Sequence, residues 1–416
     1  MENTYKISDI IDSYISGDWG NDCKTDETPF PVYCVRGADI VPISNSQYND
    51  IPLRYVSIRS FQSRCLQEGD IIIEKSGGSP TQSTGRVVYV SKELLAAKNN
   101  IVCSNFCTAF RVRKDWNAHY VFLYLQNVYN SGVFFNFEGK TSGLKNLMMD
   151  AAFKSIPIKK ITMAEQVAIV ASISSIDKKL SLNRQINDNL EAMARQLYDY
   201  WFVQFDFPNE EGKPYKSSGG AMVWNEKLKR EIPQGWSDCK LKDFIDLFDS
   251  KRVPLSSKYR GERQGAYPYY GATGIMDYVN DYIFDGDYIL LAEDGSTSDA
   301  KGFPIVQYIW GKNWVNNHAH IILPKNERYT MFTYQMLRSI PAKQIETGSI
   351  QKKISQENLC GYKMALPNSD LMEKYENIVS PLWEKRKRCI EEINALTKQR
   401  DELLPLLMNG QVSANI

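Results

Sequence analysis

Long apolar stretches are missing from this chain of 416 residues. No uncharged apolar run approaches the ~18 residues that are needed to span a bilayer. The first residues, Met-Glu-Asn-Thr-Tyr-Lys-Ile-Ser-Asp, also lack the basic-then-apolar order of a secretion signal. We therefore expect a cytoplasmic protein that has no membrane partner.

Recognisable catalytic patterns are also lacking. The eight cysteines form no Cys-x-x-Cys pair, so reduced thiols are expected. Of the three histidines, His318 and His320 could share one face of a strand, but no third metal ligand is evident near them. The absence of any Pro-Pro pair excludes the Asn- or Asp-Pro-Pro-aromatic tetrad of base-flipping methyltransferases, and no Gly-x-Ser-x-Gly elbow of a hydrolase occurs. We expect no catalytic residue, no metal and no cofactor on this chain.

Neither sign of charge is in excess. The chain has 50 basic and 49 acidic residues, so any affinity for nucleic acid must come from local patches. Hydrophobic residues make up 43% and charged residues 24%, which is typical of soluble folded proteins. At this length, two or three domains are expected.

The chain contains an internal repeat. Three short patterns of the first half return in the second half in the same order. They are Lys6–Asp12 with Lys240–Asp246, Glu68–Ile72 with Asp285–Ile289, and Ser142–Leu147 with Ser349–Ile354. The repeat indicates two copies of one module.

Each copy ends in a long helical pattern with apolar residues at heptad spacing. The seam of these helices comprises Ile169, Ile173, Ile176, Leu180, Asn183, Asn187, Leu190 and Leu197 in the first, and Leu382, Leu396 and Leu403 in the second. Some 35 helical residues span roughly 50 Å, which is longer than a globular domain needs. Because Asn183 and Asn187 would be costly in a dry seam, we expect them to face a hydrogen-bonding partner on the other helix and to fix its register.

The segments before each helix have the composition of mixed α/β structure. Runs of β-branched and aromatic residues bounded by Gly, Pro and Ser predict strands at 71–73, 85–90, 288–291 and 305–310. We expect an α/β (α+β) fold with a first module at 1–158, its long helix at 159–205, a linker at 206–231, a second module at 232–367 and its long helix at 368–410.

Both modules carry small, polar loops whose residues suit contacts with DNA. Arg, Lys, Asn, Gln, Ser and Thr read base edges, and Lys and Arg also hold phosphates. The expected DNA contacts are Lys75, Ser76, Ser79, Gln82, Thr84, Arg86, Lys140, Thr141, Ser142, Lys145 and Asn146 in the first module, and Ser296, Thr297, Lys301, Asn317, His318, His320, Ser349, Gln351, Lys352 and Lys353 in the second. The alternative is that these are ordinary solvated loops.

Several segments resemble those of a known family. Gln185–Asp206 is similar to the central conserved region, and Arg400–Gly410 to the distal conserved region, of the DNA-specificity subunit of type I restriction-modification enzymes. Ile232–Trp236 and Asn316–His320 also recur in that family. The chain departs from the family pattern at 156–166 and 366–370, where the common Pro-Leu-Pro-Pro segment is absent.

The resemblance implies two target recognition domains, each reading half of a split DNA sequence. It implies that the two long helices pack antiparallel, relate the modules by a pseudo-two-fold repeat and set the gap between the half-sites. The implied partners are double-stranded DNA, two modification subunits that bind S-adenosylmethionine and methylate adenine, and two restriction subunits that cut DNA with ATP and Mg. The chain itself would be a non-catalytic specificity subunit.

Two alternatives remain open at this point. One is a coiled-coil interaction protein with two heads that bind protein or carbohydrate, and no DNA. The other is a nuclease or methyltransferase that acts alone, which the missing motifs oppose. Binding to duplex DNA that weakens steeply with added salt separates the DNA hypothesis from the first alternative.

Overall fold

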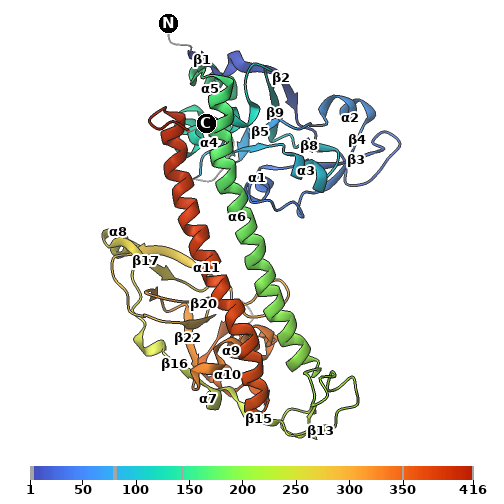
Figure 1. The fold of residues 1–416 in the computed structure, drawn as a ribbon, viewed down its shortest axis with the longest axis vertical. Helices are drawn as coiled ribbons and strands as arrows, with labels where there is room; N and C mark the ends of the chain where they lie inside the picture. Colours follow the sequence, from blue (N-terminus) through green and yellow to red (C-terminus); the bar gives the residue numbers. More distant parts are fainter. Residues whose placement is uncertain (1–3, 78–81, 142–143, 349–350, 415–416) are drawn as a thin grey trace. The chain divides into compact units, whose positions relative to one another are not determined.

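The computed structural model describes residues 4–77, 82–141, 144–348 and 351–414 and divides them into two units (Figure 1). Unit 1 comprises residues 1–185 and 390–416, and unit 2 comprises residues 186–389. Unit 1 therefore combines two segments that are far apart in the sequence, whereas unit 2 is one continuous segment. None of the helices formed by these residues has both the length and the apolar character required to cross a membrane.

Unit 1 is built around a four-stranded antiparallel sheet with the strand order β2-β9-β5-β7. The inner strand β5 (Ile71–Glu74) consists of three isoleucines and a glutamate, and all four of its residues are buried. The sheet consists of β2 (Ile11–Ser16), β9 (Cys107–Val112), β5 and β7 (Val87–Tyr89), while a second sheet consists of β4 (Leu53–Val56), β3 (Phe30–Val35) and β8 (Ile101–Cys103). Smaller sheets join β1 (Thr4–Lys6) to β12 (Pro157–Lys159), and β10 (Glu138–Thr141) to β11 (Leu144–Leu147) and β6 (Ser76–Gly77).

Short helices cover these sheets in unit 1. They are α1 (Ile40–Ser44), α2 (Ile58–Arg64), α3 (Lys92–Ala97), α4 (Ala118–Asn130) and α5 (Met149–Ser155). The side chain of Asn117 caps α4 by accepting hydrogen bonds from the amides of His119 and Tyr120. This helix buries Val121 and Leu125 in the core of the unit.

Unit 2 repeats this architecture. Its four-stranded antiparallel sheet has the order β16-β22-β19-β20, and its three-stranded sheet combines one antiparallel and one parallel pair, as the second sheet of unit 1 does. The strands are β16 (Ile245–Leu247), β22 (Ala319–Pro324), β19 (Tyr288–Ala292), β20 (Val306–Ile309), β18 (Ile275–Val279), β17 (Gln264–Tyr270), β21 (Trp314–Val315), β15 (Ser237–Lys240), β25 (Lys363–Leu366), β23 (Glu346–Thr347) and β24 (Lys353–Ile354). The short helices are α7 (Leu241–Phe244), α8 (Ser257–Glu262), α9 (Thr330–Ser339) and α10 (Gln356–Gly361). The predicted duplication of a mixed α/β module is confirmed.

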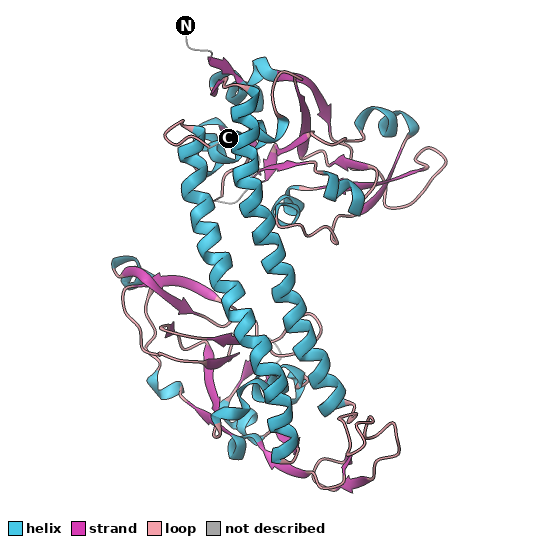
Figure 2. Ribbon diagram, viewed as in Figure 1, coloured by secondary structure: helices cyan, strands magenta, loops and turns pink. Residues whose placement is uncertain are grey.

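Two long helices, α6 (Met163–Tyr198) and α11 (Ser369–Met408), each contribute residues to both units (Figure 2). α6 begins with a reciprocal cap, because the Thr162 amide donates to the Glu165 carboxylate and the Glu165 amide donates to the Thr162 hydroxyl. This cap starts the helix without the Pro-Leu-Pro-Pro segment. α6 ends in a single π-helical turn over Asp199–Val203.

The two helices run antiparallel where they pack within each unit. In unit 1, Asn183 Nδ2 donates to Glu392 Oε2 at 2.8 Å, so the expected partner of this seam asparagine lies on α11. In unit 2, Arg386 Nη2 lies 2.6 Å from Glu191 Oε2. The Oδ1 atom of Asn187 is buried without a hydrogen-bond partner among the described residues.

The seam residues differ in burial. Buried are Ile169, Ile173, Ile176, Leu180, Asn183 and Leu190, and half-buried are Asn187, Leu197, Leu382, Leu396 and Leu403. The less regular pattern of the second helix thus coincides with partial exposure of its seam positions.

The segment treated as a linker in the sequence, 206–231, contains ordered structure. β13 (Met222–Asn225) and β14 (Arg230–Pro233) form an antiparallel hairpin. Asp206 accepts hydrogen bonds from the amide and hydroxyl of Ser217, and the Phe207 ring stacks on Trp236. The Pro, Gly and Ser content of this segment reflects tight turns, which sequence composition does not distinguish from a flexible connection.

Glu376 of α11 is a buried carboxyl group in unit 2. Its Oε1 accepts the Phe332 amide at the start of α9 at 2.7 Å, and its Oε2 accepts the Ser380 hydroxyl at 2.9 Å. Burial raises the pKa of Glu376 to about 7, although these hydrogen bonds oppose the increase. Folding therefore favours the protonated form.

We predict that Glu376→Gln makes unit 2 less sensitive to pH between about 4.5 and about 7. Because the folded pKa lies above the ordinary value of 4.5, the carboxyl group contributes fully below about 4.5 and its contribution is lost as the pH rises through about 7. Urea unfolding from pH 4 to 8 should show wild-type stability falling relative to the variant by up to about 3 kcal/mol. Glu373→Gln, an exposed position on the same helix, should retain the wild-type pH profile.

Candidate functional site

The structure brings together the two polar loop segments expected to bind DNA in unit 1. Strand β6, Ser76–Gly77, pairs with Lys145 and Asn146 of β11, and β11 pairs with β10. Ser76 Oγ donates to Asn146 Oδ1 at 2.5 Å. Residues 76–77, 138–141 and 144–147 therefore form one three-stranded sheet close to the end of β5. Ser79 and Ser142 lie outside the described residues, and only the backbones of Lys140 and Thr141 are described.

Glu74, the last residue of β5, lies next to this sheet and helps to fix its position. The buried Glu74 carboxylate accepts two hydrogen bonds from the Arg86 guanidinium, at 2.9 Å from Nε and 2.5 Å from Nη2. This carboxylate raises the pKa of Arg86. Gly77 has φ of +148°, and a Cβ atom there would lie 2.6 Å from the Glu74 carboxylate. Arg86, expected to contact DNA, instead pairs with an acid inside the unit.

Other expected contacts are also interior residues, which corrects their assignment. Thr84 and Thr297 are buried, and each donates its hydroxyl to a carboxylate, Glu138 for Thr84 and Glu346 for Thr297. Lys145 pairs with Glu138 at 3.1 Å, and its side chain is only 13% exposed. These residues hold their loops in place. The sequence could not show this, because a polar residue type in a polar loop does not reveal whether its side chain points inward or outward.

In unit 2, His320 is fully buried and therefore cannot contact a ligand directly. Its Nδ1 lies 2.6 Å from Asp249 Oδ2, and its Nε2 lies 2.8 Å from the Ile354 carbonyl oxygen. His320 thus links β22 to β24 and to the turn at Asp249.

Asp249, Glu293 and His320 place their ligand atoms within 4.8 Å of one another, as a metal site would require. Arg252 Nη1 lies 2.7 Å from Glu293, and Lys353 Nζ lies 3.2 Å from the same carboxylate. These cations already balance the acidic charge, so the cluster fits a buried ion network better than a metal centre. Although burial acts to raise the pKa of Asp249, hydrogen bonds from His320 and the Ile321 amide hold it below its ordinary value.

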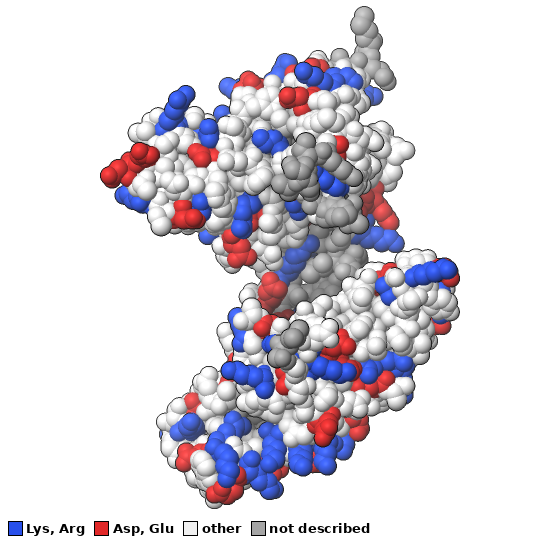
Figure 3. All heavy atoms as spheres, turned by 180° about the vertical axis from the view of Figure 1, so that it is seen from behind, with Lys and Arg blue, Asp and Glu red and all other residues white. Residues whose placement is uncertain are grey.

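The remaining expected residues lie at the surface of the two units. They are the half-buried Lys75, Ser76 and Asn146, and the exposed Gln82, Ser296, Lys301, Asn317, His318, Gln351, Lys352 and Lys353, while Ser349 lies outside the described residues. On the face drawn in Figure 3, basic and acidic side chains are interspersed over unit 1. Lys352 pairs with Glu346 at 3.1 Å, and His318 Nδ1 lies 2.6 Å from Asp294.

The structure adds a residue that sequence reasoning missed. The Phe106 carbonyl accepts the amides of Lys75 and Ser76, at 2.8 and 3.1 Å, and the His318 carbonyl accepts the amide of Glu293 at 2.8 Å. Phe106 thus occupies in unit 1 the place that His318 has in unit 2, and it is 56% exposed. Aligning Ser104–Thr108 with Asn316–His320 through the internal repeat would have found it.

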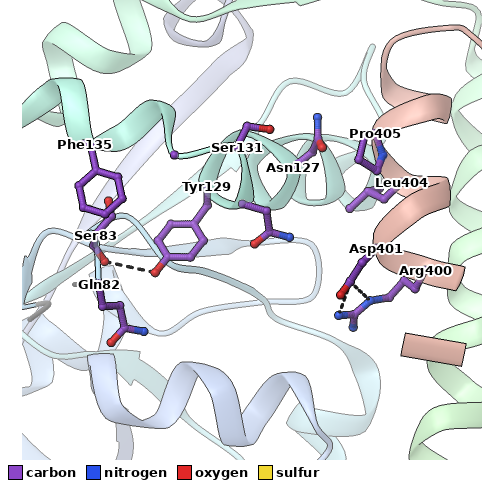
Figure 4. Close-up of a pocket in the computed structure, with 12 residues that line it drawn as sticks. Gln82, Ser83, Asn127, Tyr129, Ser131, Phe135, Arg400, Asp401, Leu404 and Pro405 are labelled. Carbon is purple, nitrogen blue, oxygen red and sulfur yellow. Dashed lines mark hydrogen bonds and ion pairs between the residues drawn. The ribbon is translucent and has the colours of Figure 1, made fainter. Parts of the chain in front are cut away.

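Unit 1 contains a hollow of about 880 Å³, and the expected DNA contact Gln82 is part of its lining (Figure 4). It is lined by residues 82–83, the end of α4 and the end of α11. The Tyr129 hydroxyl donates to the Ser83 carbonyl at 3.3 Å, and Arg400 pairs with Asp401 at 2.9 Å.

We predict that Asp249→Asn destabilises unit 2 by roughly 3–5 kcal/mol, because it leaves the buried His320 without its carboxylate partner and removes the ion pair with Arg252 Nη2 at 3.4 Å. Urea unfolding followed by tryptophan fluorescence at pH 7 measures this change. Asp246→Asn, an exposed neighbour on β16, should leave the midpoint within error of wild type. Equal midpoints for both variants would contradict a structural role for the ion network.

Both copies of the module match a known family of domains. Residues 3–192 and 233–394 match the model of the type I restriction modification DNA specificity domain. The chain is 30% identical over 157 residues to the putative type I restriction enzyme specificity subunit S.HindORF215P of Haemophilus influenzae, a match that covers 38% of this chain and 39% of that relative. It is 29% identical to the type I restriction enzyme HindI specificity subunit of the same organism, over 84% of this chain and 88% of that protein.

A solved structure has a similar fold. The S subunit of the type I restriction-modification system of M. genitalium matches with a TM-score of 0.58 at 17% identity, over 97% of this chain and 95% of that one. The family match covers both units and most of the sequence. The chain therefore belongs to the family of type I restriction-modification specificity proteins and contains two copies of its DNA specificity domain.

Proposed function

We propose that this chain reads a two-part DNA sequence for a type I restriction-modification complex, with one half-site read by each unit. The observation that carries the proposal is the pair of polar surfaces at equivalent ends of the two central sheets. Lys75, Ser76 and Asn146 supply this surface in unit 1, and Ser296, His318 and Lys353 supply it in unit 2. These side chains offer the donors and acceptors that base edges and phosphates require.

The proposal assigns the gap between the half-sites to α6 and α11. Each helix contributes residues to both units, and packed helices bend little compared with loops. Two polar pairs, one in each unit, help to fix the register of the two helices. They are Asn183–Glu392 and Glu191–Arg386. Under this proposal the domain division is 1–158 and 232–367 for recognition, with 159–205 and 368–410 as spacer helices.

The chemistry belongs to partner subunits in this proposal. Two modification subunits would bind S-adenosylmethionine and methylate adenine, and two restriction subunits would use ATP and Mg to cut DNA. Exposed apolar side chains on α6, Met163 and Val167 in unit 1 and Met193 in unit 2, provide surface on which the modification subunits can pack. The chain itself would act without catalysis or a bound cofactor, in the cytoplasm.

We predict that co-expression with the modification subunit, in a host without adenine methylation, yields a two-block methylation motif. Genome-wide mapping of methylated adenine should give two short blocks separated by a constant gap, and no motif when the chain is omitted. Binding of the complex to a duplex with this motif should weaken by roughly 10³ or more between 50 and 200 mM salt.

Two outcomes would contradict this function. A motif that does not depend on the chain would remove its role in specificity. Affinity for DNA that is absent or insensitive to salt would favour an interaction protein whose two heads bind another ligand.

We predict that Phe106→Ala relaxes sequence preference in one half-site only. An exposed aromatic side chain beside polar residues suits an apolar contact with a thymine methyl group in the groove. Loss of this contact should reduce discrimination at one or two positions by about 5- to 150-fold, since a mismatch costs about 1–3 kcal/mol. Ile58→Ala, at a position of equal exposure on α2, is the matched control and should retain the wild-type motif. An unchanged motif in both variants would exclude Phe106 from recognition.

A further inference from the structure

Unit 2 carries a second group of lysines, away from the expected recognition loops. We name Lys240, Lys242, Lys325 and Lys363 the lysine ridge. All four are exposed, and none of them forms an ion pair in the part of the chain that the structure describes. Lys240 of β15 and Lys363 of β25 are direct cross-strand partners. The Lys325 amide donates to the Phe244 carbonyl of α7 at 2.9 Å, which brings this lysine to the same end of the unit.

Positive charge exceeds negative charge at the lysine ridge. Like charges that face each other across an antiparallel pair destabilise it. The neighbouring acid Asp238 is already bound by Lys227 at 2.9 Å, which leaves Asp243 as the near carboxylate. Figure 3 shows Lys and Arg side chains gathered at the end of unit 2 that carries β13, β15 and α7. An anionic partner would remove this repulsion.

The composition of the ridge favours a nucleic acid backbone over a protein. Protein interfaces are depleted in lysine and enriched in aromatic residues and arginine, and none of the four ridge residues is of those types. Lysine is a flexible point charge that suits phosphates whose positions do not depend on base sequence.

The ridge and the recognition surface lie at opposite ends of the central sheet of unit 2. His318 precedes strand β22, and Lys325 follows it. The six residues of β22 rise about 20 Å, which is roughly six base pairs of duplex. A duplex that is read at His318 and continues along β22 for this length can reach the ridge.

We propose that the lysine ridge binds the phosphate backbone of double-stranded DNA just outside the half-site read by unit 2. This proposal rests on the function proposed above. It adds a contact that depends on how far the duplex extends beyond the half-site and not on its base sequence. The equivalent sheet of unit 1 carries the exposed lysines Lys6 and Lys159 on β1 and β12. The same place in the repeat is thus basic in both units, as expected if one DNA duplex contacts this place in each unit.

The test compares Lys240→Gln/Lys242→Gln/Lys363→Gln with wild type, each as full chain assembled with the modification subunit. Two duplexes carry the mapped motif: one ends at the half-site of unit 2, which is the half-site unaffected by Phe106→Ala, and one extends about ten base pairs further, about one helical turn. On the extended duplex we expect weaker binding by the variant and a salt slope smaller by roughly 2 to 3, about 0.9 for each lost phosphate contact. On the short duplex, variant and wild type should bind equally.

A charge-matched control separates the ridge from a general effect of charge. Lys258→Gln/Lys343→Gln/Lys374→Gln removes three exposed lysines elsewhere in unit 2 and should bind both duplexes as wild type does. Equal binding of ridge variant and wild type to the extended duplex would overturn the proposal, as would equal losses on both duplexes. Weaker assembly of the ridge variant with the modification subunit before DNA is added would assign the ridge to a protein interface instead. If the wild-type complex finds no specific duplex, the proposed function itself fails.

Discussion

Each unit depends on the burial of apolar side chains that the two long helices supply from distant parts of the sequence. Unit 1 buries Leu404 and Leu407 of α11 in the same core as Ile169 and Ile173 of α6. Unit 2 buries Tyr375 and Trp383 of α11 against Tyr198 and Ala194 of α6. Neither amphipathic helix could keep these side chains exposed to water without a large loss of stability. The surface of unit 1 that we propose reads DNA is therefore held in a body that includes the last turns of the final helix.

A second constraint separates the charged residues that fold the units from those that remain available for a partner. Glu74 and Arg86 in unit 1, and Asp249 and His320 in unit 2, lie under the loops at the ends of the central sheets. A buried charge without a partner would be costly, so these groups satisfy one another. Above them, Ser76 donates to Asn146 and His318 lies 2.6 Å from Asp294, so these described polar side chains are held in position before a ligand binds.

The two units share architecture but differ in surface chemistry. Phe106 and His318 occupy equivalent turns, yet one is apolar and the other is held by Asp294. Equivalent positions with different side chains are what a chain needs if its two halves read different base sequences on one duplex. The scaffold can remain constant, because the sheets and helices position these residues without depending on their identity.

The sequence by itself determined the duplicated mixed α/β organisation and the two long helices, because hydrophobic periodicity and repeated order are properties of the chain. It also located the polar loops. Only the tertiary structure decided that Thr84, Thr297 and His320 point inward, since buried acids distant in sequence bind them. The opposition of Lys240 and Lys363 likewise depends on strand pairing between residues more than a hundred positions apart, which no local pattern encodes.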